Sequence, residues 1–211
     1  MISVILPVVR PEQANVVVEL IKERAGIECE IITDIDHDRI GCPKMVKKLV
    51  EQTKYDYVCF IGDDCIPLND FLINAYNYMK DNDLYLVGLN DKTSRTLPAH
   101  WLADKKLLKH CENEEFFYTG YTHCYCDMEL KDNAAKLNRY GYCTDSVVLH
   151  DHPMFTGEQT NDKDYIRVYS EKVKGKDRDL YYTRKLGYKV MTFELNCPHC
   201  QKTIEVAKEL A

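Results

Sequence analysis

Residues 57–64 read Tyr-Val-Cys-Phe-Ile-Gly-Asp-Asp, an aromatic and β-branched run that stops abruptly at two adjacent carboxylates. A short apolar run of this kind predicts a buried strand. Asp63 and Asp64 then lie at the carboxyl end of that strand, where open α/β sheets bind ligands. Adjacent carboxylates repel one another unless a cation or strong donors neutralise them, and Mg²⁺ or Mn²⁺ suits hard oxygen ligands. The pair therefore indicates a divalent metal site, with a solvated turn as the plainer alternative.

Strand and helix patterns alternate on both sides of this run, which predicts an α/β fold with a mostly parallel central sheet flanked by helices. The expected strands are 2–6, 29–33, 57–61, 84–89 and 142–149, and the expected helices are 11–24, 43–52, 69–80 (capped by Asn69), 101–110, 127–139 and 177–185. Residues 153–176 are expected to form a polar, mobile segment. We expect one domain, residues 1–190, followed by a tail, 191–211, with a Cys-Pro-His-Cys motif and a short helix.

The composition is typical of one soluble globular domain. The 211 residues are 45% hydrophobic and 29% charged, and no apolar stretch has the length of a membrane span. The first residues predict a strand rather than a signal peptide, so a cytoplasmic location is expected. The ten cysteines are scattered and are therefore expected to be free thiols. A formal net charge of −6 weighs against a dedicated nucleic-acid binder.

Charge is unevenly distributed along the chain. Residues 161–189 carry nine Lys or Arg against five Asp or Glu, interleaved with tyrosines. Such a segment can follow phosphates and stack on bases, so a nucleic-acid partner stays open. A solvated basic face is the alternative.

Three carboxylate clusters fall at the ends of predicted elements, and in a doubly wound sheet these ends share one edge. The clusters are Asp34 with Asp36, Asp63 with Asp64, and Asp127 with Glu129. Asp127 opens a predicted helix, where the helix dipole stabilises an ionised carboxylate that can act as a general base; a helix cap is the alternative. His150 follows another apolar run and could complete a metal site near the acid pair, or be a loop residue.

Six short pieces, taken in order over residues 1–190, resemble the family 2 glycosyltransferases, which have the GT-A nucleotide-sugar fold. The pieces are 2–7 (first strand and turn), Asp34 with Asp36, 62–67 (the D-x-D segment and its proline), 126–130 followed by 139–142 (the E-D-x-E-L segment and its turn), 147–150, and 181–187. The resemblance implies a Rossmann-like nucleotide-binding half and an acceptor half.

The resemblance also implies an activity: inverting, metal-assisted transfer of a sugar from a nucleotide-diphosphate donor, expected to be a UDP-sugar, to an acceptor hydroxyl. Asp127 would be the base, and Asp64 and His150 would hold Mn²⁺ or Mg²⁺. The nucleotide would lie against Pro7, Asp34, Asp36 and Asp63. Trp101 and Glu129 would face the acceptor, although a core position is equally open for Trp101. Lys163 and Arg167 could close over the diphosphate.

Two departures from the family pattern keep other functions open. Gly62 replaces the first D-x-D acid, and Cys126 replaces the glutamate before the base. A non-catalytic, zinc-stapled binding module on the same fold and a nucleotidyltransferase are the alternatives. The second fits less well, because the turn after the first strand is not rich in glycine. The acceptor stays open between a glycan and a modified nucleobase in DNA.

The tail motif could bind zinc. Cys197 and Cys200 supply two ligands, whereas a structural zinc site needs about four. His123, Cys124 and Cys126 would have to supply the others, or a second subunit would, which makes a homodimer one alternative. A redox pair is another.

Overall fold

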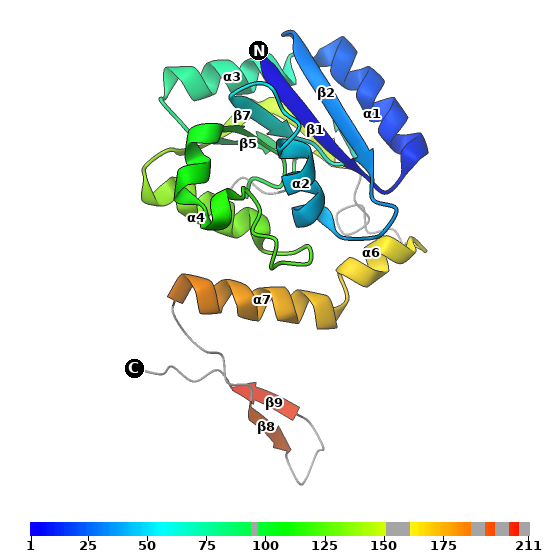
Figure 1. Ribbon diagram of the computed structural model, residues 1–211, viewed down its shortest axis with the longest axis vertical. Helices are drawn as coiled ribbons and strands as arrows, with labels where there is room; N and C mark the ends of the chain where they lie inside the picture. The colour runs from blue at the N-terminus through cyan, green and yellow to red at the C-terminus, as the bar shows by residue number, and fades with distance from the viewer. Residues whose placement is uncertain (94–96, 151–160, 187–192, 197–202, 207–211) are drawn as a thin grey trace.

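The computed structural model describes residues 1–93, 97–150, 161–186, 193–196 and 203–206 (Figure 1). Within these ranges a seven-stranded sheet has the order β2-β1-β3-β6-β5-β7-β4. The strands are β1 (Ile2–Val8), β2 (Cys29–Ile35), β3 (Tyr57–Phe60), β4 (Cys65–Pro67), β5 (Leu86–Asn90), β6 (Trp101–Asp104) and β7 (Tyr140–His150). The helices are α1 (Pro11–Arg24), α2 (Cys42–Val50), α3 (Phe71–Asp81), α4 (Cys126–Lys136), α6 (Lys163–Val168) and α7 (Glu171–Leu186), with 3₁₀ helices η1 (Lys105–His110) and η2 (Glu112–Glu114).

The sheet is mixed, and its parallel part positions the strand ends. β1 pairs in parallel with β2 and β3, and β5 pairs in parallel with β7. β6 lies antiparallel between β3 and β5, and β4 lies antiparallel to β7. The expected α/β class is confirmed, with these two strands reversed.

Helices cover both faces of the sheet, as expected for nearly continuous apolar strands. In Figure 1, α1 and α3 lie on one side of the sheet and α2, α4 and α7 on the other. The core on the first side contains Ala14, Val17 and Ile21 of α1 with Phe71, Leu72, Ala75 and Met79 of α3. The core on the second side contains Val46 and Leu49 of α2, Leu130 and Ala134 of α4, and Tyr181 of α7.

The expected helix over residues 101–110 is wrong in its first half. Residues 101–104 form β6, all of them buried, and only 105–110 form a helix, which is of the 3₁₀ type. Asp104 ends the strand and caps this helix by accepting a hydrogen bond from the Lys106 backbone N–H. Trp101 is fully buried against Phe60, Phe116 and Phe117. The expectation that Trp101 faces an acceptor is therefore wrong, and its core position is the correct alternative.

Three further expectations need correction. α3 begins at Phe71 after Asp70, whose backbone is left-handed, and no side chain caps it, so the predicted Asn69 cap is wrong. Of the expected polar, mobile segment 153–176, residues 153–160 lie outside the described ranges, while residues 163–168 form α6 and residues 171–176 form the first turns of α7. In the tail, Thr203–Val206 forms strand β9 and pairs with β8 (Phe193–Asn196), so these four residues are not part of the expected helix. Three of the four residues at 203–206 are β-branched, which favours a strand.

The remaining expectations about the chain stand as follows. The eight cysteines within the described ranges are free thiols, as expected. Cys197 and Cys200 lie outside the described residues, so their zinc site stays a prediction, as does the domain boundary near residue 190. None of the helices in the described part of the chain combines the length and apolar character that crossing a membrane requires.

Candidate active site

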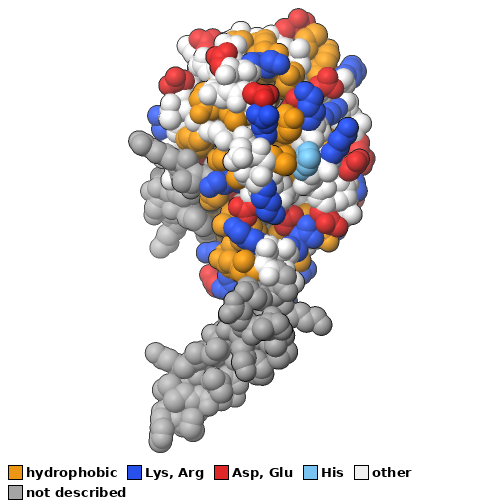
Figure 2. All heavy atoms as spheres, turned by 90° about the vertical axis from the view of Figure 1, so that its left-hand side faces the viewer, with side chains coloured by type: hydrophobic (Ala, Val, Ile, Leu, Met, Phe, Trp, Pro, Cys, Tyr) orange, Lys and Arg blue, Asp and Glu red, His pale blue; other side chains and the backbone are white. Residues whose placement is uncertain are grey.

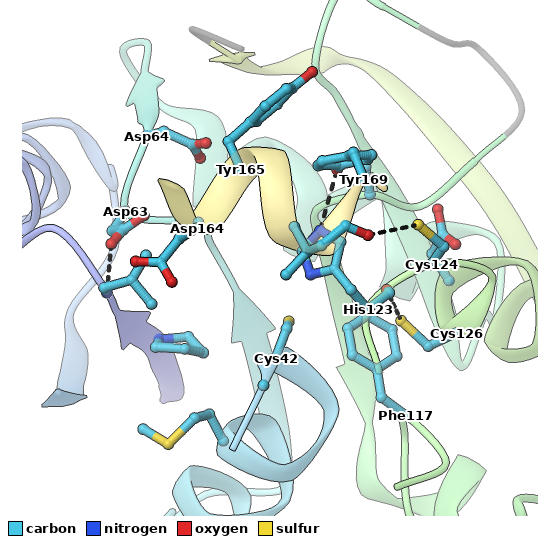
Figure 3. A pocket seen from close by; sticks show the side chains of 18 of the residues that line it. Cys42, Asp63, Asp64, Phe117, His123, Cys124, Cys126, Asp164, Tyr165 and Tyr169 are labelled. Atoms are coloured by element: carbon cyan, nitrogen blue, oxygen red, sulfur yellow. Dashed lines mark hydrogen bonds between the residues drawn. The ribbon is translucent and has the colours of Figure 1, made fainter. Parts of the chain in front are cut away.

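A cavity of about 430 Å³ opens at the carboxyl ends of β1 and β3 (Figure 3). Its lining comes from segments far apart in the sequence: Pro7, Asp36, Asp63, Asp64, Asp127, His150 and side chains of α6. Parallel neighbouring strands end at the same edge of a sheet, so the ends of β1, β2 and β3 form one wall. The start of α4, which carries Asp127, contributes to another.

Asp63 holds the turn that follows β1. Its Oδ2 accepts hydrogen bonds from the backbone N–H groups of Val9 and Arg10, both at 2.7 Å, and its Oδ1 accepts one from Arg10 Nη1 at 2.9 Å. Burial raises the pKa of Asp63, and these hydrogen bonds oppose the rise. Both carboxylate oxygens of Asp63 thus accept hydrogen bonds from the turn itself. Asp63 therefore has a structural role in the cavity wall.

Arg10 connects this turn to α6. Its guanidinium lies 2.9 Å from Asp63 and 3.8 Å from Asp64, and its Nη2 lies 2.7 Å from Asp162, which caps α6. Asp164 and Tyr165 of this helix, and Tyr169 directly after it, lie over the cavity in Figure 3. The same arginine therefore orients the acid pair and the helix above it.

Asp64 faces the cavity beside His150. The Asp64 Oδ1 and His150 Nε2 atoms are 3.5 Å apart. Burial alone would raise the pKa of Asp64, but the hydrogen bond with His150 and the attraction of His150, His100 and Arg10 hold it well below its usual range. An ionised carboxylate next to an imidazole is a donor set that fits a divalent cation.

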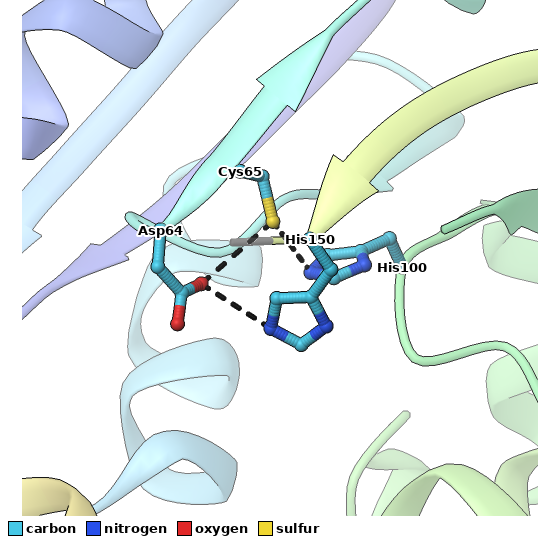
Figure 4. A group of neighbouring side chains, drawn as sticks. All are labelled: Asp64, Cys65, His100 and His150. Carbon is cyan, nitrogen blue, oxygen red and sulfur yellow. Dashed lines mark hydrogen bonds and ion pairs between the residues drawn. The ribbon is translucent and has the colours of Figure 1, made fainter. Parts of the chain in front are cut away.

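Two further side chains of this group, Cys65 and His100, were not predicted from the sequence. Cys65 Sγ lies 2.9 Å from His100 Nε2 and 3.7 Å from Asp64 Oδ1 (Figure 4). His100 directly precedes β6. Because a helix was expected in place of β6, the sequence did not indicate that the His100 side chain lies near the end of β3. Cys65 begins β4, a three-residue strand too short to predict.

The structure explains the glycine in the D-x-D segment. A Cβ atom at Gly62 would lie 2.8 Å from Asp64 Oδ1, 3.2 Å from His100 Nε2 and 3.4 Å from Cys65 Sγ. A side chain at this position would therefore have to displace the Asp64 carboxylate or the His100 ring, and glycine leaves these groups in place.

Asp127 lies near the start of α4 and lines the same cavity, as expected. Its Oδ1 accepts a hydrogen bond from the backbone N–H of Met128 at 2.9 Å. Burial raises the pKa of Asp127 and the charge of Asp91 adds to the rise, while the backbone hydrogen bonds oppose it. A carboxylate with a raised pKa facing a cavity can accept a proton from a bound hydroxyl.

Asp177 of α7 fixes the loop that leads to Asp127. It is fully buried and accepts hydrogen bonds from the backbone N–H groups of Thr122 (2.9 Å), His123 (2.8 Å) and Cys124 (2.9 Å). Gly41, at the start of α2, approaches the other side of this loop. Its φ is +94°, and a Cβ there would lie 2.8 Å from the Thr122 carbonyl oxygen. Nothing in the sequence around Asp177 indicated this anchoring role.

Two residues expected at the nucleotide, Asp34 and Asp36, make contacts within the chain. Asp34 pairs with Lys48 and is not among the residues that line the cavity, so its expected place beside a nucleotide stays a prediction. Asp36 does line it, but its carboxylate also accepts from the backbone N–H groups of Ile40 and Gly41.

Glu129 also lies outside the cavity. It accepts two hydrogen bonds from Arg184, both 2.8 Å, and its expected acceptor-side position stays a prediction. Of the basic residues on α6 and α7, Arg167 and Lys174 line the cavity, whereas Lys163 does not.

No family model matches this sequence, and no curated protein matches it. Solved structures do match. TarS 1-349 from S. aureus is 13% identical, with a TM-score of 0.57 over 98% of this chain and 99% of that one. The chain has the GT-A fold.

Two further GT-A structures superpose on this chain. The mannosyltransferase PcManGT from Pyrobaculum calidifontis, in complex with GDP-Man and Mn²⁺, is 13% identical, with a TM-score of 0.60 over 89% of this chain and 64% of that one. Glucosyl-3-phosphoglycerate synthase from Mycobacterium tuberculosis, with Mn²⁺, UDP and phosphoglyceric acid, is 14% identical, with a TM-score of 0.60 over 100% of this chain and 88% of that one. The fold expected from the resemblance is thereby confirmed.

The anchoring role of Asp177 leads to a prediction. Asp177→Ala leaves three partly buried backbone N–H groups without their acceptor, and should lower the free energy of unfolding by about 3 kcal/mol. Hydrogen exchange should accelerate at residues 122–124. Asp179→Ala on the same helix is the control, because Asp179 is more exposed and pairs only with the neighbouring Arg178 among the contacts described. Equal exchange rates in the two variants would show that Asp177 does not hold the loop.

Proposed function

We propose that this chain is a glycosyltransferase that moves a sugar from a nucleotide-diphosphate donor, of the UDP-sugar class, to an acceptor hydroxyl with inversion. One observation carries the proposal: Asp127 and the Asp64–His150 pair face the same cavity at the carboxyl ends of β1 and β3. The likeness to TarS in complex with UDP-GlcNAc, and to glucosyl-3-phosphoglycerate synthase with Mn²⁺ and UDP, supports it.

Asp64 and His150 are the residues that would hold Mn²⁺ or Mg²⁺. When bound, such a cation neutralises negative charge on the leaving diphosphate. Arg167 and Lys174 also line the cavity and supply further positive charge on the side of α6 and α7. Pro7 and Asp36 line the part of the cavity nearest β1 and β2, where the nucleoside would lie.

Asp127 would accept the proton of the attacking hydroxyl. Burial favours the neutral form of this carboxyl group, so gaining a proton relieves an unfavourable buried charge. The Met128 N–H holds the carboxylate in place while it does so. The rate advantage of a positioned base of this kind is about 10²–10⁴-fold.

The acceptor is more consistent with a carbohydrate than with nucleic acid. Arg184 is paired with Glu129, and Lys185 lies 2.8 Å from Asp132, so these cations of the basic segment are engaged within the chain. On the face shown in Figure 2, basic and acidic side chains are interspersed and form no patch of a single sign. A nucleic-acid acceptor would favour a continuous basic surface.

The test of this function is a thermal-shift panel of nucleoside diphosphates with and without Mn²⁺. We expect UDP with Mn²⁺ to raise Tm, since a ligand at a hundred times its Kd stabilises the native state by about 2.7 kcal/mol. Either component alone should have a smaller effect. A panel with no shift for any nucleotide would refute the proposal and favour the non-catalytic binding module.

The assignment of the base gives a mutational prediction. Asp127→Asn removes the proton acceptor but keeps the shape of the side chain, so sugar transfer should fall by about 10²–10⁴-fold while UDP with Mn²⁺ still raises Tm. Asp132→Asn on the same helix, outside this cavity, is the matched control and should transfer at close to the unmodified rate. Unchanged turnover in Asp127→Asn would remove Asp127 from the mechanism.

The raised pKa of Asp127 predicts how the rate depends on pH. Only the ionised carboxylate accepts a proton, so kcat/KM should rise with pH through the pKa of this group and level off above it. Because burial raises that pKa, the inflection should lie above the ordinary aspartate value of about 3.9. This rise of kcat/KM with pH should be missing from the residual activity of Asp127→Asn. A fall of kcat/KM as the carboxyl group ionises would contradict the role of Asp127 as the base.

A further inference from the structure

Four potential metal ligands of different chemistry converge at one edge of the cavity. They are a carboxylate oxygen of Asp64, the Sγ of Cys65 and a ring nitrogen from each of His100 and His150, all within 4.8 Å of one another (Figure 4). The sheet brings them together. Cys65 of β4 is the register partner of His150 at the end of β7, and His100 lies immediately before β6.

The separations fit one ion at the centre of the group. Cys65 Sγ lies 2.9 Å from His100 Nε2, His150 Nε2 lies 3.5 Å from Asp64 Oδ1, and Cys65 Sγ lies 3.7 Å from the same oxygen. In a tetrahedral site with ligand bonds of about 2.0–2.3 Å, neighbouring ligand atoms are roughly 3.3–3.7 Å apart. The two separations from Asp64 Oδ1 already lie in this range, whereas Cys65 Sγ and His100 Nε2 must move apart to admit an ion.

The donor types select the kind of metal. Thiolate and imidazole ligands favour zinc and neighbouring transition metals, whereas Mg²⁺ prefers oxygen ligands and retained water. A site that needed only to place Mg²⁺ on a diphosphate would gain nothing from the sulfur of Cys65 or the nitrogen of His100.

The local backbone keeps space for the ligands. The Cβ that Gly62 lacks would lie within 3.4 Å of the ligand atoms of Asp64, Cys65 and His100. Access comes from the cavity, because Asp64, His100 and His150 line it while Cys65 lies behind them at 1% exposure.

We propose that Asp64, Cys65, His100 and His150 form a binding site for a divalent metal of the zinc class that fills without nucleotide, with the Cys65 thiolate as one ligand. On binding, the thiol proton leaves to solvent and the sulfur electron pair binds the ion. The site shares Asp64 and His150 with the proposed function, but the proposal concerns the chain without a donor and adds Cys65 and His100 to the ligands.

Cobalt spectroscopy tests this directly. The full-length chain is first freed of metal with a chelator, and Cys197→Ser with Cys200→Ser removes the tail cysteines as a competing source of thiolate. Co²⁺ should then give a thiolate-to-cobalt charge-transfer band in the near ultraviolet and the visible bands of a tetrahedral ion, and one equivalent of Zn²⁺ should abolish both. An absence of the charge-transfer band at saturating Co²⁺ would overturn the proposal.

Matched variants in the same background locate the site. Cys65→Ser should lose the charge-transfer band, whereas Cys124→Ser, which changes another cysteine near the same cavity, should keep it. Gly62→Ala retains all four ligands but places a methyl group among them, and should weaken Co²⁺ binding by roughly 10- to 100-fold. Circular dichroism verifies that each variant is folded. A band that survives in folded Cys65→Ser, or full Co²⁺ affinity in Gly62→Ala, would place the metal elsewhere.

The outcome is independent of the proposed transferase activity. If cobalt gives no band but UDP with Mn²⁺ still raises Tm, only the four-ligand site is wrong. If the band forms as described and no nucleotide raises Tm, the metal site stands and the transferase function falls.

Discussion

The carboxylate of Asp63 fixes the geometry on which the rest of this site depends. It accepts the backbone N–H groups of the turn after β1, and so ties the end of that strand to the end of β3. The two adjacent aspartates then have separate partners: Asp63 is held by backbone donors and Arg10, while Asp64 turns to His150. This division relieves the repulsion between neighbouring charges and leaves one carboxylate facing the cavity.

The opposite wall depends on a second buried carboxylate. Asp177 holds the loop before α4 through three backbone N–H groups, and Gly41 lets the start of α2 lie directly against that loop. Asp127 is therefore carried by a segment clamped between α2 and α7. Two carboxylates with structural roles thus place two carboxylates that face the cavity, and mobility in either wall would change the distance between Asp127 and Asp64.

Much of the N-terminal part of the fold could be predicted because its signals are local. Helix α1 has the expected limits, Pro11–Arg24, since a proline begins it and its apolar spacing is regular. β1 and β3 are continuous apolar runs, and the acids at their ends mark the edge of the sheet. Asp64, Asp127 and His150 were expected to meet for this reason, and they line one cavity.

The rest depends on contacts between segments distant in the sequence. β6 has four residues and no alternating pattern, so only its position between β3 and β5 makes it a strand. Trp101 is in the core for the same reason. α6 and α7 are polar along most of their length, and Asp177 is indistinguishable from a surface acid until the loop that it binds is known. The proximity of His100 to Cys65 follows from the placement of β6 and could not be read from spacing.

The central claim is that a cation at Asp64 and His150 and the carboxylate of Asp127 act on one bound nucleotide-sugar. A crystal structure of the chain with UDP and Mn²⁺, with anomalous data at the manganese edge, tests it most directly. The account predicts an anomalous peak against Asp64 and His150 with the diphosphate beside it, and Asp127 on the same cavity. A nucleotide bound outside this cavity, or manganese remote from Asp64, would contradict the account.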